Sequence, residues 1–129
     1  MPIDYVIDHE HRVVRARVSG VMSDDDVFTY QSTVWSRPDV LGYDELVDMS
    51  EVRHIALPSV KRVRDLANLS VTKDHPDRES RFAIVAPGQV SYILARLYKA
   101  IRGATPGSRR QVGVFYTLPE ALRFLGLEA

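Results

Sequence analysis

The sequence predicts an α/β fold: a mixed sheet of about five strands with helices mainly on one face. Two short alternating segments at the start of the chain are spaced as a β-hairpin. Strands and amphipathic helices then alternate to the end of the chain, and one late strand is a continuous apolar run. An opening hairpin followed by alternating elements indicates a sheet that is antiparallel at its start and parallel afterwards.

The first two strands are predicted from apolar residues that recur at every second position, which is the period of a strand. These residues are Ile3, Tyr5 and Ile7 in the first strand and Val14, Ala16 and Val18 in the second. A short polar turn over residues 8–11 joins the two strands, and Gly20 is expected to end the second one. Arg15 and Arg17 share the other face of the second strand, so we expect that face to meet water and the helices to lie opposite.

The first helix is predicted to begin after Ser23, a good N-cap, and the acidic run 24–26 suits the positive end of the helix dipole. Its apolar residues at helical spacing are Val27, Tyr30 and Val34. Pro38 stops this helix. The short apolar pair Leu46-Val47 is predicted as the third strand, and the nearby acidic residues Asp44, Glu45, Asp48 and Glu51 are expected to form a solvated rim.

The second helix is predicted to begin at Pro58, which suits a first helical position. A polar loop over residues 71–80 precedes the apolar run 82–85, which is typical of a strand buried on both faces. The third helix has the clearest amphipathic pattern, through Val90, Ile93, Leu94, Leu97, Tyr98 and Ile101. A turn-rich break at 103–107, a last strand at 112–115 and a short helix opened by Pro119 complete the chain.

Composition limits the class of protein. The 129 residues suit a single domain, 1–129, and equal numbers of basic and acidic residues, 17 each, argue against a nucleic-acid partner. There is no cysteine, so disulfides and thiolate ligands are excluded. No apolar run reaches the roughly 20 residues that span a bilayer, and the start of the chain lacks the features of a signal peptide. We therefore expect a cytoplasmic protein without a transmembrane segment.

The order of elements and several short motifs resemble the STAS superfamily of anti-sigma-factor antagonists, and more narrowly its SpoIIAA-like branch of small bacterial proteins. The motifs that carry the resemblance are Val18-Ser19-Gly20, Ser23-Asp24-Asp25-Asp26, Asp48-Met49-Ser50, Ala83 to Pro87, Arg96, Val114-Phe115 and Phe124-Leu125. In that branch an opening hairpin ends in glycine before an acidic helix start, and a later strand ends in an Asp-x-Ser-like turn. The resemblance covers nearly the whole chain and implies a regulatory or protein-interaction domain.

One departure from the resemblance concerns the regulatory switch. In anti-sigma-factor antagonists, the helix that follows the third strand starts at an Asp-Ser-Ser-Gly motif whose serine is phosphorylated. The matching stretch here is Ala56-Leu57-Pro58-Ser59, so Pro58 falls on or beside the switch position and the acidic and glycine residues are missing. Ser59 is the candidate for phosphorylation near a helix start, where an anion is favoured. A serine in the first turn without a regulatory role is the better interpretation.

Catalytic and metal-binding chemistry has little support in the sequence. His9 and His11 alternate in the hairpin turn and would share a face, but spacing identifies no third ligand, so we predict no metal and no cofactor. An undetected hydrolase or isomerase would have to use Asp48, His54 or Tyr92, and this is the least favoured hypothesis. No nucleophile elbow or phosphate-binding loop is present, so we expect a protein that is not an enzyme.

Two features favour binding. The turn after the apolar strand leads into a helix at the edge where open α/β sheets bind ligands, and it places Gly88, Gln89, Tyr92 and Arg96 in a weak candidate site for a small anionic or amphipathic ligand. Basic residues on the second and third helices and just before the last strand could form a surface for an anionic partner or for peripheral membrane contact, although a solvated helix face is the plainer interpretation; they are Lys61, Arg62, Arg64, Arg96, Lys99, Arg102, Arg109 and Arg110.

The leading functional hypothesis is thus a non-catalytic regulatory or protein-interaction domain, and the alternative is a binder or carrier of a lipid-like or small anionic ligand held between helices and sheet. A homodimer is also expected, because an exposed sheet face or edge needs cover. Three aromatic residues that lie off the main stripes of their helices support that expectation: Phe28, Trp35 and Phe124.

Overall fold

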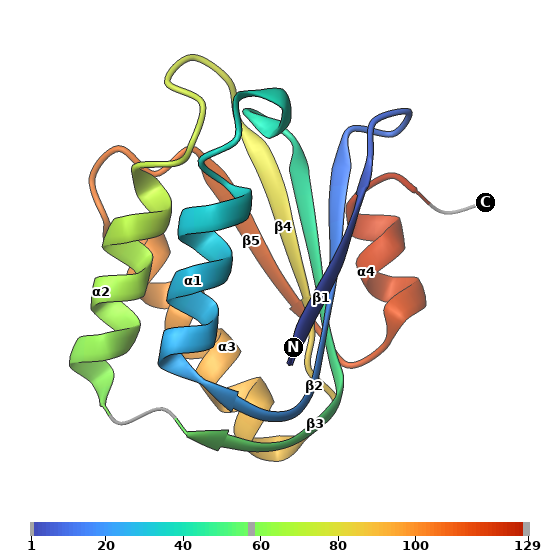
Figure 1. Cartoon of the computed structure of the whole chain (residues 1–129), viewed down its shortest axis with the longest axis vertical. Coiled ribbons are helices and arrows are strands. Elements are labelled where there is room, and N and C mark those ends of the chain that lie inside the picture. The colour runs from blue at the N-terminus through green and yellow to red at the C-terminus, as the bar shows by residue number, and fades with distance from the viewer. Residues whose placement is uncertain (1, 57–58, 128–129) are drawn as a thin grey trace.

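The structure, a computed structural model, describes residues 2–56 and 59–127. Its centre is one five-stranded sheet in the order β1-β2-β3-β4-β5, in which β1 and β2 are antiparallel and the other neighbours are parallel (Figure 1). The strands are β1 (Ile3–Asp8), β2 (Val13–Ser23), β3 (Asp44–Ala56), β4 (Ser80–Val85) and β5 (Arg110–Phe115). The predicted α/β fold with a mixed sheet is confirmed.

Three of the four α-helices lie on one face of the sheet and the fourth lies on the other (Figure 1). On the first face are α1 (Asp24–Val34), α2 (Val60–Val71) and α3 (Gln89–Ala104), and on the second is α4 (Leu118–Phe124). A short 3-10 turn, η1 (Pro38–Val40), precedes β3. The expectation that helices lie mainly on one face is confirmed, and α4 packs on the opposite face against β4 and β5, in an apolar cluster that also includes Leu46 of β3.

Two strands are longer than their sequence patterns indicate. The prediction that Gly20 ends β2 is wrong, because the strand continues to Ser23 and Gly20 takes a φ of 68° at an irregularity in the pairing with β3. A residue at positive φ next to a shifted register is typical of a β-bulge, which bends a strand without ending it. Asp48-Met49-Ser50 was expected to form a turn, but it lies inside β3 because the pairing of β2 with β3 continues beyond it.

The start of α1 follows the predicted capping chemistry. The hydroxyl of Ser23 accepts a hydrogen bond from the amide of Asp26, whose carboxylate accepts one from the Ser23 amide in return. Thr117 and Glu120 form the same reciprocal pair at the start of α4. Such capping satisfies N–H groups that a helix leaves without internal partners.

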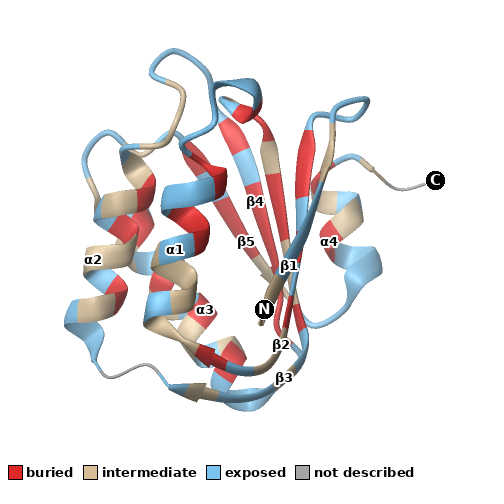
Figure 2. Cartoon of the chain, viewed as in Figure 1, coloured by how far each residue is buried: buried red, intermediate tan, exposed pale blue. Residues whose placement is uncertain are grey.

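The two halves of the outer sheet face differ in character. Under α4 the face is apolar, whereas the β1–β2 half carries the exposed charges of Asp4, Arg15 and Arg17. Figure 2 shows buried residues concentrated in the inner strands and on the sides of the helices that face the sheet. The expectation that the arginine-bearing face of β2 meets water is confirmed. Within the described residues, no helix is long and apolar enough to cross a bilayer.

Candidate functional site

An apolar cavity of about 100 Å³ lies between the sheet and helices α1, α2 and α3. Apolar atoms form nearly all of its surface. The apolar side chains that line it include Val18, Met22, Val27, Val47, Met49, Val63, Leu66, Phe82, Ile84 and Leu94. Genuinely empty protein cavities are apolar, and one of about 150 Å³ binds benzene. A cavity of this size therefore suits a small apolar group or a short stretch of hydrocarbon chain.

One edge of the cavity is closed by a contact between α1 and α2. The Arg62 Nε donates to Asp24 Oδ2 at 2.6 Å, and the Arg62 guanidinium lies 4.3 Å from the centre of the Phe28 ring. All three residues line the cavity and are only partly buried, so they stand between its apolar interior and water. The hydrogen bond from Arg62 lowers the pKa of Asp24, and the same bond raises the pKa of Arg62.

The cavity borders a buried polar group around Glu45. The Glu45 carboxylate accepts hydrogen bonds from Tyr30 Oη at 2.8 Å, Trp35 Nε1 at 3.2 Å and Arg110 Nη1 at 3.3 Å. The Arg110 guanidinium also lies over the Trp35 ring at 4.3 Å. Burial raises the pKa of Glu45, and the positive charge of Arg110 opposes that shift. The expectation that Glu45 belongs to a solvated rim is wrong, because its position in β3 points it inward with only 2% of the residue exposed.

A second buried ion pair adjoins the first. Arg102 is fully buried, and its Nη2 donates to the Asp74 carboxylate, which also lies 3.6 Å from Arg110 Nε. Its Nη1 donates to Tyr98 Oη at 3.3 Å, and Tyr98 in turn contacts Ser70 Oγ at 2.6 Å. Two guanidinium groups thus face two carboxylates within the protein, which limits the cost of burying each charge.

The prediction of a basic surface is wrong for the residues in these buried ion pairs. Arg102 and Arg110 were expected on the surface but are buried, and Arg62 is engaged with Asp24. The helical spacing could have predicted that Arg102 is buried, because Arg102 follows the core residue Tyr98 by four positions and therefore shares its side of the helix. The alternation of the strand could have predicted that Glu45 points inward, because Glu45 lies two positions before Val47 on the same face of the strand.

The four residues predicted as a weak ligand site lie together at the start of α3. Gly88 is the N-cap and Gln89 the first helical residue, and both are exposed. The Tyr92 ring stacks on Tyr116, with centroids 4.3 Å apart and planes 8° from parallel, and Arg96 is exposed one helical turn further on. Tyr116, directly after β5, was not anticipated because only the fold brings it beside α3.

Ser59 and the residues of the least favoured hypothesis make local contacts. Ser59 is the N-cap of α2, and its hydroxyl accepts from the Arg62 amide at 3.2 Å; Leu57 and Pro58 lie outside the described residues. The Asp48 carboxylate accepts from the amide and hydroxyl of Ser50, at 2.9 and 2.5 Å. Among the described residues, Asp48, His54 and Tyr92 share no hydrogen bond that would form a catalytic group.

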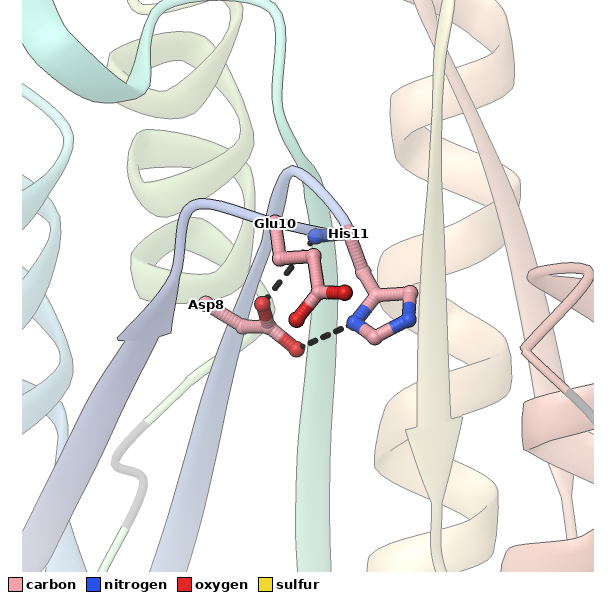
Figure 3. A group of neighbouring side chains, drawn as sticks. All are labelled: Asp8, Glu10 and His11. Carbon is pink, nitrogen blue, oxygen red and sulfur yellow. Dashed lines mark hydrogen bonds and ion pairs between the residues drawn. The ribbon is translucent and has the colours of Figure 1, made fainter.

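The hairpin turn does not bring its two histidines to one point. His9 Nδ1 lies 2.7 Å from Tyr43 Oη, whereas His11 Nδ1 lies 2.8 Å from Asp8 Oδ2. Possible ligand atoms of Asp8, Glu10 and His11 lie within 4.8 Å of one another at this end of the hairpin (Figure 3). Glu10 and His11 are exposed in the turn, and Asp8 is the half-buried last residue of β1. Asp8 and His11 are hydrogen-bonded to each other, and the bond from the His11 amide lowers the pKa of Asp8.

The three aromatic residues that suggested a dimer surface have partners within the chain. Phe28 lies under the Arg62 guanidinium, and Trp35 is only 3% exposed beside Arg110. Phe124 packs against Phe115, with ring centroids 5.3 Å apart. Each of the three thus has a contact within the chain, and Phe28 and Phe124 are half-buried.

Comparison with known proteins supports the fold. No family model matches the chain, and no curated protein matches it. A solved structure, that of an uncharacterized protein from the DUF3478 family with a SpoIIAA-like fold from Shewanella loihica PV-4, matches with a TM-score of 0.59 and 18% sequence identity. The match covers 95% of this chain and 93% of that one. Together with the strand order and the placement of the helices, it shows that this chain has a SpoIIAA-like fold.

Proposed function

We propose that this protein is a non-catalytic, STAS-like binding domain that holds the apolar part of a small ligand between helices α1, α2 and α3 and the sheet. The apolar cavity is the observation that carries the proposal. Burial of hydrocarbon contributes about 25 cal/mol for each Å² removed from water, so even a short chain gains affinity in such a site. The alternative hypothesis from the sequence, a carrier of a lipid-like ligand, is therefore the form of binding that the cavity favours.

Access to this cavity would pass between α1 and α2. Asp24, Phe28 and Arg62 lie at that edge, and Arg62 offers a positive charge beside the apolar interior. A ligand with a hydrocarbon chain and an anionic head would place the chain inside and the head near Arg62, in competition with Asp24. This arrangement joins the two ligand properties, apolar and anionic, that the sequence suggested separately.

The proposal is tested by filling the cavity. Ala95 lines it and Ala100 is exposed on the same helix, so Ala95→Leu and Ala100→Leu add the same atoms inside and outside the site. Xenon under pressure tests whether the cavity accepts an apolar atom, and fatty acids of increasing length test whether it accepts a lipid-like ligand. Binding of both probes is followed by NMR of the methyl groups of Met49 and Val27. We expect both probes to bind the wild type and the Ala100→Leu variant, and Ala95→Leu to weaken binding about tenfold, or ~1.4 kcal/mol.

Two results would overturn the proposal: no shift of the cavity methyl groups with either probe, or equal binding by Ala95→Leu and the wild type. Circular dichroism establishes that each variant is folded. If Ala95→Leu does not fold, Val27→Leu adds one methylene to the cavity from α1 and takes its place.

A second candidate function is the protein-interaction role implied by the resemblance. Three apolar residues in the first turns of α2 and α3 are strongly exposed: Val60, Val90 and Ile93, at 54%, 61% and 61%. Both helices start after strands that run in parallel, so these turns lie at the same end of the molecule. Exposed apolar groups gathered in this way favour a surface for a protein partner or a second copy.

A further inference from the structure

The apolar cavity between the sheet and helices α1, α2 and α3 has a mouth and a closed end. Asp24 and Arg62, in the first turns of α1 and α2, stand at the mouth, where both residues are only partly buried. Tyr30 lines the cavity six residues further along α1, which is about 9 Å along a helix axis. Glu45 lines the same end, where its carboxylate accepts the hydrogen bond from Tyr30. A ligand that enters beside Arg62 thus reaches buried polar groups after a short distance.

The closed end is held together by hydrogen bonds to buried charges. Tyr30 Oη donates to Glu45 at 2.8 Å, and the two residues are 8% and 2% exposed. Tyr98, which also lines the cavity, contacts Ser70 at 2.6 Å and accepts from Arg102 at 3.3 Å. A hydrogen bond to a charged group contributes about two to four times as much as one buried methylene. A chain that pushed these side chains apart would therefore lose more than each added carbon gains.

The volume of the cavity sets a second limit on the ligand. An apolar cavity of about 150 Å³ takes benzene, a ring of six carbons. In the same proportion, a cavity of about 100 Å³ takes about four carbons. Its walls come from the sheet and all three helices and include Val27, Leu66, Phe82 and Leu94. Because protein interiors are packed as densely as organic crystals, such walls resist further expansion.

We propose that the cavity selects a short-chain amphipathic anion, with about four carbons of its alkyl chain buried and its anionic head beside Arg62. This class of ligand rests on the proposed function and narrows it, from lipid-like ligands in general to short-chain anions. A longer chain meets the pair of Tyr30 and Glu45 and has to leave its remaining carbons in water. Affinity therefore rises with chain length at first and then levels off.

Straight-chain carboxylates from propanoate to decanoate, each below its micellar concentration, are the probes. Binding to the full chain is followed by NMR of the methyl groups of Val27 and Met49, which line the cavity. From propanoate to pentanoate we expect the affinity to rise about fourfold with each carbon, or ~0.8 kcal/mol. It should level off between pentanoate and hexanoate, and decanoate should bind no more tightly than hexanoate. A rise of about fourfold per carbon that continues to decanoate would overturn the chain-length limit.

Two matched substitutions on α3 test whether the cavity sets this limit. Leu94 and Leu97 are both half-buried, but Leu94 lines the cavity, whereas Leu97 packs against the core beside it. Each change to alanine removes about three carbons, so Leu94→Ala should move the plateau to about octanoate and Leu97→Ala should leave it unchanged. An unmoved plateau in Leu94→Ala, or an equal move in both variants, would contradict the limit. Circular dichroism checks folding, and Leu66→Ala on α2 replaces Leu94→Ala if that variant does not fold.

Failure of the chain-length limit and failure of the proposed function give different results. If neither xenon nor any acid shifts the cavity methyl groups, the proposed function is itself wrong. If xenon enters but no acid does, or if the acids bind with an affinity that keeps rising, the cavity still binds apolar groups and only the short-chain class is wrong.

Discussion

At the residue scale, the main departure from an ordinary apolar core is the buried group of two carboxylates and two guanidiniums. Glu45 and Asp74 neutralise Arg102 and Arg110, and hydrogen bonds from Tyr30 and Trp35 add to the stabilisation of Glu45. These residues come from α1 and the position after it, from α3, β3 and β5, and from the loop before β4. Their side chains are almost completely buried, so each charge depends on its partners rather than on water. The group therefore fixes how α1, α3, β3 and β5 meet.

We predict that Asp74→Asn destabilises the fold by about 3–5 kcal/mol, because it leaves a buried positive charge without its counterion. Urea unfolding of the variant and the wild type measures the difference. Asp39→Asn is the matched control, since it breaks the exposed pair with Arg37 and should change stability little. Equal effects of the two substitutions would contradict the proposed role of the buried group.

At the scale of elements, α1 is held to α2 by the pair of Asp24 and Arg62 at the cavity edge. The folded-state pKa of Asp24 is lower than its ordinary value of 3.8, chiefly through the hydrogen bond from Arg62. A carboxyl group of this kind stabilises the fold above its unfolded pKa, and the contribution is lost as the pH falls through the folded pKa. The attachment of α1 is thus expected to weaken in acid.

A double-mutant cycle of Asp24→Asn and Arg62→Gln isolates this pair from other effects of the same residues, such as the helix dipole. We expect a favourable coupling that is constant at neutral pH and disappears as the pH falls below 3.8. Urea unfolding at a series of pH values measures it. A coupling that is absent at neutral pH, or that persists unchanged in strong acid, would show that the pair does not hold α1 in place.

At the scale of the whole molecule, the homodimer stays a prediction, but the residues expected to form its interface are different. The sheet face between β1 and β2 is charged, and Phe28, Trp35 and Phe124 have partners within the chain, so neither needs a second copy. The exposed residues Val60, Val90 and Ile93 at the starts of α2 and α3 provide one candidate surface, and the sheet edges at β1 and β5 are another.

We expect size-exclusion chromatography with light scattering to show a dimer that Ile93→Glu converts to a monomer, because a charge cannot be buried in an apolar contact without a large cost. Val6→Glu is the control, since Val6 is 66% exposed on the charged sheet face. A wild-type monomer at all concentrations, or a dimer that only Val6→Glu disrupts, would contradict this surface.

The sequence by itself predicted the fold class and most elements, because periodicity, capping residues and breakers act over a few neighbouring positions. Ser23 caps α1 as predicted, residues 82–85 form a doubly buried strand, and the stripe from Val90 to Ile101 marks α3. Strand ends were less predictable: β2 passes through Gly20 because pairing with β3 continues beyond it.

Only the tertiary structure decided which distant residues meet. Glu45 and Arg110 are 65 positions apart, and their pairing depends on how β3 and β5 are placed within one sheet. The cavity needs three helices and the sheet to be packed together, and Tyr116 joins the start of α3 only once β5 lies beside β4. Local patterns determine elements, whereas cavities, buried ion pairs and stacked rings arise from packing between elements, which no short stretch of sequence encodes.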